Sequence, residues 1–303
     1  MRTRTLARDA ARWASPSYRR WRRLLRSLAL DPDQLKRPVK DPPPRDFIIC
    51  GAPRSGTSLL AAVLYQPPDV VTVMEPWDGL RLAPADLFTS IRDEIARTGW
   101  LTRGRLDVAA LNSKGEVRWG RDGEFPHAVA ASRDYLLGIK WPAFYRYLAL
   151  LPRTKFLVCL RHPVEVITSY SKQGGRLRHG LEYDIAFNRK MNGHLRSATD
   201  QDAVRRILLY DYVNLQLARY IGRPNIFVVR YERWFEDKER LLTELGRFLG
   251  TDLGPGAAVI RRPRPVDIPA SDLELIRRHC TSAALLGYEL DEPQPLTPHP
   301  KVS

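Results

Sequence analysis

The sequence predicts a three-layer α/β fold with a mainly parallel central sheet flanked by helices. Three observations support this prediction. Short apolar runs of the kind found in strands buried on both faces recur at 47–50, 156–160 and 226–229. Helical segments follow these runs, as expected for strands that pair in parallel through helical crossovers. The chain has 303 residues, 44% of them hydrophobic, and is therefore long enough to bury a substantial core.

The first run leads into a glycine-bearing loop, residues 51–56, and then into the first turn of a helix. The N–H groups that open a helix lack partners, and the helix dipole adds partial positive charge, so the arrangement predicts a P-loop-like phosphate cradle. In a Walker A loop a lysine follows the second glycine, and the next Ser/Thr binds Mg²⁺. Here Thr57 stands at the lysine position, and the cation is Arg54. The loop is therefore predicted to bind an anion without a magnesium clamp.

A second strand-turn-helix segment begins with the run at 156–160. Arg161 follows this strand, and Pro163 suits the first position of the next helix. Ser169 lies eight residues after Arg161, about two helical turns into that helix. The arginine and the serine are placed to hold one phosphate together. For either residue alone, an ordinary strand-end arginine or an ordinary helix serine is the favoured interpretation; the two motifs together favour the phosphate site.

These two motifs resemble the 5′-phosphosulfate loop and the 3′-phosphate site of sulfotransferases that use 3′-phosphoadenosine 5′-phosphosulfate (PAPS). Arg230-Tyr231-Glu232 is similar to a further segment of that family, and the resemblance covers roughly residues 46–290. It implies a P-loop-like fold, PAPS as the co-substrate and no metal requirement. The resemblance also implies the following nucleotide-binding residues: Arg54, Ser55, Gly56, Thr57, Ser58, Arg161, Ser169 and Tyr231.

Sulfuryl transfer needs a base for the acceptor's proton and cations for the transferring group. Glu75 follows a predicted strand at 70–74 and lies twenty-one residues after Arg54, a spacing that resembles that of the glutamate base in tyrosylprotein sulfotransferases and related bacterial enzymes. Lys140 ends another predicted strand, at the position from which the family's second lysine reaches the sulfuryl group. The resemblance thus makes Glu75, Arg54 and Lys140 the catalytic residues. The histidine base of the cytosolic enzymes has no counterpart here.

Several alternatives to these roles remain open. A glutamate has an ordinary pKa of about 4.3, so Glu75 needs a partly desolvated setting, for example beneath Trp77 or Trp141, to act as a base near neutral pH. Otherwise it is a surface carboxylate that opens a loop, just as Lys140 is otherwise a solvated strand end. The possible rival bases are His127, His179 and His194.

The sequence predicts one catalytic domain, residues 46–290. A basic amphipathic segment at 1–30 and a proline-rich linker at 31–45 precede it, and a disordered tail at 291–303 follows. Two segments, 81–135 and 176–221, are predicted to be acceptor-facing insertions.

The C-terminal part of the predicted domain departs from the family pattern. Where the cytosolic enzymes close a loop over the cofactor, this chain has Arg261, Arg262 and Arg264, which either supplement the 3′-phosphate site or are surface charge. A final helix is predicted over 271–286, opened by a capping box at Ser271.

The formal net charge of +15 is uneven, because residues 1–30 hold nine arginines and one aspartate. This segment either lies on an anionic membrane surface or packs on the domain through its Trp/Leu stripe. No apolar run reaches 18 residues, and no secretory signal is evident, so the sequence predicts a cytoplasmic protein. Peripheral contact with a membrane through residues 1–30 remains one alternative. The three cysteines, Cys50, Cys159 and Cys280, have no metal-ligand spacing and are predicted to be small buried hydrophobes.

Taken together, these features predict a PAPS-dependent sulfotransferase. The predicted acceptor is a hydroxyl of a glycan or glycolipid; phenols, peptides and small metabolites remain alternatives, and no specific nucleic acid is expected as a partner. The other functions consistent with the sequence are an ATP-dependent kinase of P-loop type and a non-catalytic polyanion- or membrane-binding adaptor. The kinase is disfavoured because no lysine follows Gly56 and no Walker-B-like run ending in Asp is evident.

Overall fold

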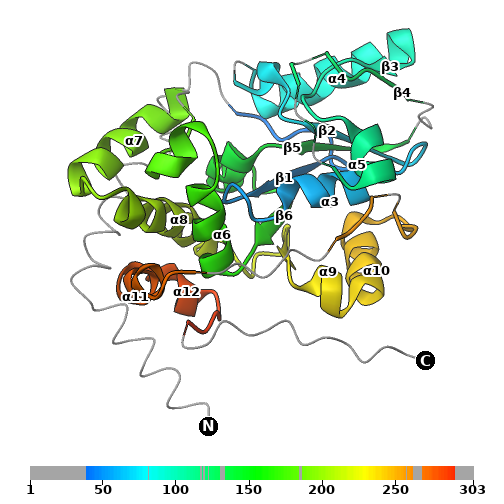
Figure 1. The fold of residues 1–303 in the computed structure, drawn as a ribbon. Helices are drawn as coiled ribbons and strands as arrows, with labels where there is room; N and C mark the ends of the chain where they lie inside the picture. The colour runs from blue at the N-terminus through cyan, green and yellow to red at the C-terminus, as the bar shows by residue number, and fades with distance from the viewer. Residues whose placement is uncertain are drawn as a thin grey trace, which may run out of the picture. The chain divides into compact units, whose positions relative to one another are not determined.

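The computed structural model describes residues 39–80, 82–116, 118, 120–121, 123–129, 134–183, 186–256, 258–261 and 268–290. The chain divides into two compact units (Figure 1). The first, here the sheet unit, has its described residues between 39 and 161 and between 213 and 261. The second, here the helical unit, has its described residues between 162 and 212 and between 268 and 290. The residues predicted as one catalytic domain thus contribute to both units.

The sheet unit contains a five-stranded sheet in the order β2-β5-β1-β6-β7. Every pairing in it is parallel. The strands are β1 (Phe47–Gly51), β2 (Val70–Met74), β5 (Leu136–Lys140), β6 (Lys155–Leu160) and β7 (Ile226–Arg230). A short antiparallel pair, β3 (Trp100–Leu101) with β4 (His127–Ala128), lies outside this sheet. The predicted parallel sheet and its flanking helices are confirmed.

One face of the sheet packs on a layer of helices. This layer includes α3 (Thr57–Val63), α9 (Arg233–Glu236) and α10 (Lys238–Leu249). Apolar side chains from both layers form a continuous core there, such as Ile49 and Leu157 from the sheet and Leu60 and Leu245 from the helices. Burial of this surface supplies the main driving force for the layer. Helices α9 and α10 are separate because Asp237 leaves the helical conformation between them (φ −156°, ψ 57°).

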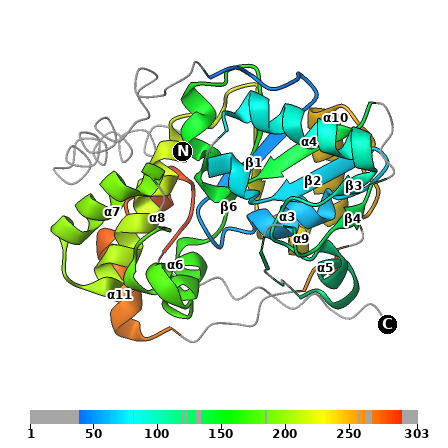
Figure 2. The same ribbon diagram turned by 90° about the horizontal axis from the view of Figure 1, so that it is seen from above.

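The other face of the sheet unit carries α4 (Pro84–Thr98), drawn above the sheet in Figure 1 and on its near side in Figure 2. This helix lies within the segment predicted as an insertion over 81–135, but it is regular and forms a core layer. Its apolar residues Leu87, Phe88 and Ile91 are fully buried. Arg92 ties it to the sheet through an ion pair with Asp46.

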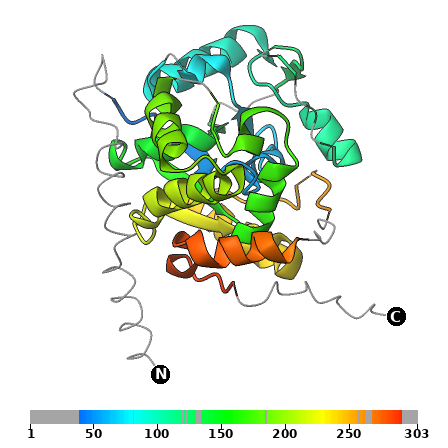
Figure 3. The same cartoon turned by 60° about the vertical axis from the view of Figure 1, so that its left-hand side comes forward.

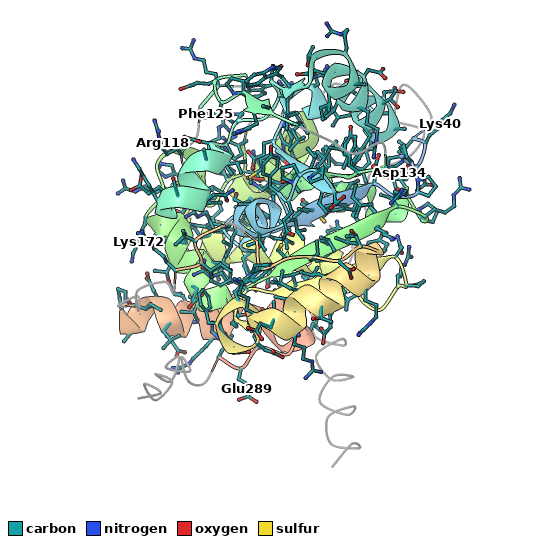
Figure 4. The ribbon with its side chains drawn as sticks, turned by 90° about the vertical axis from the view of Figure 1, so that its right-hand side faces the viewer. Lys40, Arg118, Phe125, Asp134, Lys172 and Glu289 are labelled. Atoms are coloured by element: carbon teal, nitrogen blue, oxygen red, sulfur yellow. The ribbon has the colours of Figure 1, made fainter. Side chains whose placement is uncertain are left out.

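The rest of the 81–135 segment is built from short elements. They include α5 (Val108–Lys114), and the 3₁₀ helix η2 (Trp77–Leu80) comes just before the segment. Arg118 lies over the ring of Phe125, 5.9 Å from its centre, and pairs with Asp107 at 3.4 Å (Figure 4). After β5 the chain forms another 3₁₀ helix, η3 (Pro142–Ala149), where a one-helix crossover is expected.

The helical unit contains no described strand. Its elements are α6 (Pro163–Ser171), η4 (Gly175–His179), α7 (Ala186–Ala198), the start of α8 (Asp202–Ala218), α11 (Ala270–His279) and α12 (Ser282–Leu285). Ile167 of α6, Ile207 of α8 and Ile276 of α11 line a common small cavity. Figure 3 shows α11, in orange, beside α8 in yellow-green.

The final helix predicted over 271–286 is wrong in two respects. It is two helices, because Cys280 takes an extended conformation and Asp211 binds the residues that follow. The capping box is also absent: α11 starts at Ala270 after Pro269, and no side chain caps it. Ser271 is therefore already inside the first turn.

Other sequence-based expectations are confirmed or lie outside the described residues. Cys50, Cys159 and Cys280 are free and buried, as predicted. In the part of the chain that the structure describes, no helix has the length and apolar character needed to cross a bilayer. The segments predicted at 1–30 and 291–303, and most of the linker at 31–45, lie outside the described residues.

Candidate functional site

Each of the five parallel strands ends beside a residue that the sequence predicts for the site. The loop with Arg54 follows β1, Glu75 follows β2, Lys140 ends β5, Arg161 follows β6, and Tyr231 follows β7. Parallel strands have their carboxyl ends at one edge of the sheet, which is where open α/β sheets bind their ligands. The fold therefore brings these residues to a single edge.

The loop after β1 has a backbone that depends on glycine. Gly56 caps α3 with φ 97°, and a Cβ on it would lie 2.5 Å from Cδ2 of Tyr231. At Gly51 a Cβ would lie 2.5 Å from the carbonyl oxygen of Cys159. Arg54 adopts φ 70°, a left-handed conformation that is uncommon for a non-glycine residue. These turns bring the main chain to the start of α3 without a side chain in the way.

The start of α3 has the properties of an anion cradle. No side chain caps the helix, and its first turn has no acidic residue. The N–H groups of this turn have no acceptors within the helix. The hydroxyl of Ser55 is buried and has no hydrogen-bond partner among the described residues. The loop thus offers unsatisfied donors and an exposed cation, Arg54.

Glu75 and Lys140 form a buried ion pair. Nζ of Lys140 lies 2.5 Å from Oε1 of Glu75, and the residues are 2% and 8% exposed, respectively. The pair forms because β2 lies next to β5, with Met74 in register with Lys140. The Glu75 N–H also donates to the Lys140 carbonyl at 2.8 Å. Because a buried charge is costly without a partner, each residue stabilises the other.

The geometry of Glu75 suits a group that acts on a ligand. It has φ 51° and so leaves β2 through a left-handed turn. Oε1 accepts a hydrogen bond from Nζ of Lys140. Oε2 accepts no hydrogen bond from any residue that the structure describes. Glu75 is buried, which is the desolvated setting that a role as base requires. The positive charge of Lys140 lies beside its carboxylate. That pairing was missed from the sequence, because it depends on the order of strands in the sheet.

Arg161 and Tyr231 both contact the loop after β1, residues 51–56, here called the phosphate loop. Nη1 of Arg161 donates to the Arg54 carbonyl at 3.3 Å, and its guanidinium lies 4.1 Å from the centre of the Tyr231 ring. Tyr231 in turn lies against Gly56. The structure therefore places Arg54, Gly56, Arg161 and Tyr231 together. Ser169 lies on α6 in the helical unit.

The remaining candidates belong to other elements of the structure. His179 pairs with Asp202 in the helical unit at 2.7 Å, and its hydrogen bond lowers the pKa of that carboxyl. His127 belongs to β4, where burial lowers the pKa of its imidazole, and His194 lies on α7. Arg261 lies beside Gly115, and Arg262 and Arg264 are outside the described residues. No cluster of metal-ligating side chains occurs among the described residues.

The sheet with an anion cradle at its carboxyl edge defines a P-loop-like α/β protein. Residues 46–255 match the model of the sulfotransferase family, and the chain belongs to that family. Nodulation protein NoeE of Sinorhizobium fredii (strain NBRC 101917 / NGR234) is 28% identical over 227 residues, which cover 70% of this chain and 51% of that protein. The chain thus spans about half the length of this curated relative.

Solved structures of sulfotransferases are also similar. The sulfotransferase from Alicyclobacillus acidocaldarius is 19% identical, with a TM-score of 0.40, over 83% of this chain and 98% of that chain. The sulfotransferase domain from the curacin biosynthetic pathway is 16% identical, with a TM-score of 0.44, over 82% of this chain and 99% of that chain.

Proposed function

We propose that this protein transfers the sulfuryl group of PAPS to an acceptor hydroxyl, with Glu75 as the base. The observation that carries the proposal is the meeting, at one sheet edge, of the phosphate loop, Arg161 and the buried Glu75–Lys140 pair. Membership of the sulfotransferase family supports sulfuryl transfer in general. The donor, the base and the acceptor are the specific parts of the proposal.

The residues of the loop fit the donor. In the proposal, the N–H groups of Ser55–Ser58 and the buried Ser55 hydroxyl bind the 5′-phosphosulfate. Arg161 binds the 3′-phosphate, and the role predicted for Ser169 from the sequence stays a prediction. A guanidinium suits this task because its planar donors match phosphate oxygens. Thr57 in place of the Walker A lysine favours PAPS over ATP with Mg²⁺ as the nucleotide.

The chemical step follows from the charges beside the loop. Oε2 of Glu75 accepts the proton of the acceptor hydroxyl, whose oxygen forms a bond to sulfur. The bond between sulfur and the oxygen of the 5′-phosphate breaks, and its electron pair stays on that phosphate. Lys140 and Arg54 stabilise the negative charge that develops on the sulfuryl and phosphate oxygens. The products are the sulfated acceptor and 3′-phosphoadenosine 5′-phosphate.

Nucleotide binding gives the first test. We expect calorimetric titration to show that 3′-phosphoadenosine 5′-phosphate binds without metal at least about tenfold more tightly than ATP or ADP, with or without Mg²⁺. Arg161→Ala should weaken this binding at least tenfold, because it removes charge-assisted hydrogen bonds worth about 1.5–3 kcal/mol. Arg153→Ala is the matched control, since that arginine side chain is 87% exposed before β6. Preference for ATP with Mg²⁺ would indicate a kinase, and absence of any nucleotide binding would indicate an adaptor.

For the acceptor we propose a sugar hydroxyl of a glycan or glycolipid. Trp77 supports this class, because it lies two residues after Glu75 and is 45% exposed. Arg105 lies over its indole ring, 5.0 Å from the centre, and the neighbouring Asp78 pairs with Arg103 at 3.3 Å. An exposed aromatic ring held in this way offers a flat surface for the apolar face of a sugar ring. The outer strand β2 thus supplies the acceptor side, while β1, β6 and β7 supply the donor side.

The acceptor side is tested by kinetics. Transfer of radiolabelled sulfate from PAPS to neutral oligosaccharides, phenols and peptides identifies the acceptor class. With the best sugar, Trp77→Ala should raise KM about tenfold and change kcat less than about threefold, because the ring supplies binding that is equal in the ground and transition states. Trp100→Ala is the matched control, since Trp100 is 47% exposed and lies on β3. Transfer to phenols alone would contradict the sugar assignment.

A further inference from the structure

Tyr231 lies at the junction of the two elements proposed to bind the phosphates. The sequence predicts it as a nucleotide contact, but its ring is packed against Gly56 on one element and Arg161 on the other. We propose that Tyr231 is a positioning residue, an aromatic clamp that fixes the phosphate loop and the Arg161 guanidinium relative to each other. This inference rests on the proposed function, since it concerns the same nucleotide site.

The clamp holds the loop through a close approach. An ideal Cβ at Gly56 would lie 2.5 Å from Cδ2 and 3.2 Å from Cε2 of Tyr231. The ring therefore lies directly against the left-handed turn that opens α3. It is itself supported by Phe235, whose ring meets it edge-on with centres 5.4 Å apart and packs on the core cluster of the sheet unit. The loop thus rests on a ring that is anchored in the core.

The same ring holds Arg161. Its guanidinium lies 4.1 Å from the ring centre, close enough for a cation–π interaction. Nη1 of this arginine also donates to the carbonyl of Arg54, in the loop. The backbone adds a third link, because the Tyr231 N–H donates at 2.9 Å to the carbonyl of Leu160, the residue before Arg161. Loop and arginine therefore share one support.

Stacking leaves the arginine able to bind an anion. The N–H donors of a guanidinium lie in its plane, so a ring against its flat face leaves phosphate binding to its edge. Holding this edge and the loop in fixed positions lowers the ordering cost of a ligand that bridges both. The benefit should be larger for 3′-phosphoadenosine 5′-phosphate, which carries both phosphates, than for adenosine 5′-monophosphate, which carries one.

A double-mutant cycle read by calorimetry tests the clamp. Tyr231→Phe keeps the ring and should leave the affinity for 3′-phosphoadenosine 5′-phosphate within about twofold of wild type. Tyr231→Leu should lower the affinity for 3′-phosphoadenosine 5′-phosphate about fivefold. The same substitution should lower the affinity for adenosine 5′-monophosphate less than about twofold. In an Arg161→Ala background the leucine substitution should cost less than about twofold, because its partner is already gone. Tyr220→Leu is the matched control, since Arg223 lies 4.6 Å from that ring.

Three outcomes would overturn the clamp. Equal losses in Tyr231→Phe and Tyr231→Leu would show that the hydroxyl contacts the nucleotide. Additive losses in the double variant would show that Tyr231 and Arg161 act independently. If Tyr231→Leu does not fold, Arg161→Lys replaces it: this variant keeps the charge but loses the flat stack, and should also bind the bisphosphate about fivefold more weakly. Unchanged binding in Arg161→Lys would contradict the clamp.

Failure of the proposed function is distinguishable from failure of the clamp. If the wild-type protein binds no 3′-phosphoadenosine 5′-phosphate, the proposed function is wrong. The clamp is then tested without nucleotide, by the same cycle on the midpoint of urea unfolding, using the Phe, Leu and Arg161→Ala variants. Non-additive shifts would support the contact between Tyr231 and Arg161, and additive shifts would overturn it.

Discussion

Replacing Glu75 by glutamine is expected to lower the turnover of sulfuryl transfer by about 10²–10⁴-fold, the usual contribution of a general base. Glutamine keeps the size of the side chain and removes its ability to accept the acceptor's proton. Binding of 3′-phosphoadenosine 5′-phosphate should stay within about threefold of wild type, because Glu75 follows the outer strand β2, whereas the residues proposed to bind the nucleotide follow β1, β6 and β7. Turnover and calorimetry on the same preparation measure the two effects.

Because Glu75 is paired with Lys140, the effect of Glu75→Gln on turnover must be separated from its effect on stability by a second variant. Glu75→Gln leaves a lysine that is 2% exposed without its carboxylate, and breaking a buried pair costs about 3–5 kcal/mol of stability. Glu75→Gln combined with Lys140→Met removes both charges, and should restore stability but not turnover. Glu94→Gln is the matched control, since Glu94 is also buried and pairs with Arg103 at 2.7 Å. Normal turnover in a folded Glu75→Gln variant would remove Glu75 from the role of base.

Replacing Asp211 by alanine is expected to destabilise the helical unit by about 3–5 kcal/mol. This carboxylate is fully buried on α8. It accepts hydrogen bonds from the N–H and hydroxyl groups of Thr281 and Ser282, at 2.6–2.8 Å, at the start of α12. Alanine would leave these donors, buried at Ser282 and half-buried at Thr281, without their acceptor. Urea unfolding followed by circular dichroism measures the loss.

Asp202→Ala is the control for this prediction. Asp202 lies on the same helix, but its side chain is 42% exposed in its pair with His179, so its loss should cost less than about 1 kcal/mol. Equal effects of the two alanine substitutions would show that burial and hydrogen bonding at Asp211 do not set the stability of this unit.

The pH dependence of Asp211 is part of the same expectation. Burial raises the pKa of this carboxyl above its ordinary value of 3.8, and the hydrogen bonds from Thr281 and Ser282 oppose the rise. A raised pKa in the folded state means that folding favours the protonated form. The stability that Asp211 gains from this shift is thus full below about pH 4 and is lost as the pH rises through the folded-state pKa. The stability of wild type relative to Asp211→Asn should therefore fall with rising pH across that range.

The parts of the fold encoded in local sequence were predicted well. The strand at 47–51 and its glycine loop carry their own signals, since apolar residues, two glycines and the helix start are adjacent in the chain. Helix α4 also had such a signal. Pro84 opens it, and its apolar residues Leu87, Ile91 and Ile95 recur at helical spacing, but the segment was predicted as an insertion and no helix was assigned to it.

What depends on distant parts of the chain was not predictable. The Glu75–Lys140 pair exists because β5 inserts between β2 and β1, and nothing local to either residue indicates that order. The break at Cys280 likewise follows from Asp211, which lies far away in the sequence. Tyr231 was predicted to be part of the site, whereas its contact with Gly56 depends on the packing of β7 against β6 and could not be predicted.

At Arg54 and Glu75 the backbone is left-handed, so the residue that would be most stable there differs from the residue that the proposed activity needs. Arg54 and Glu75 are the two non-glycine residues with positive φ in the described part of the chain, and both belong to the proposed site. Such a conformation costs about 1–3 kcal/mol for an ordinary L-residue, and glycine would relieve it at either position. Either glycine substitution would remove a charged side chain from the edge of the sheet. A search for stabilised variants of this protein should therefore recover glycine at these two positions, and those variants should be the ones that lose activity.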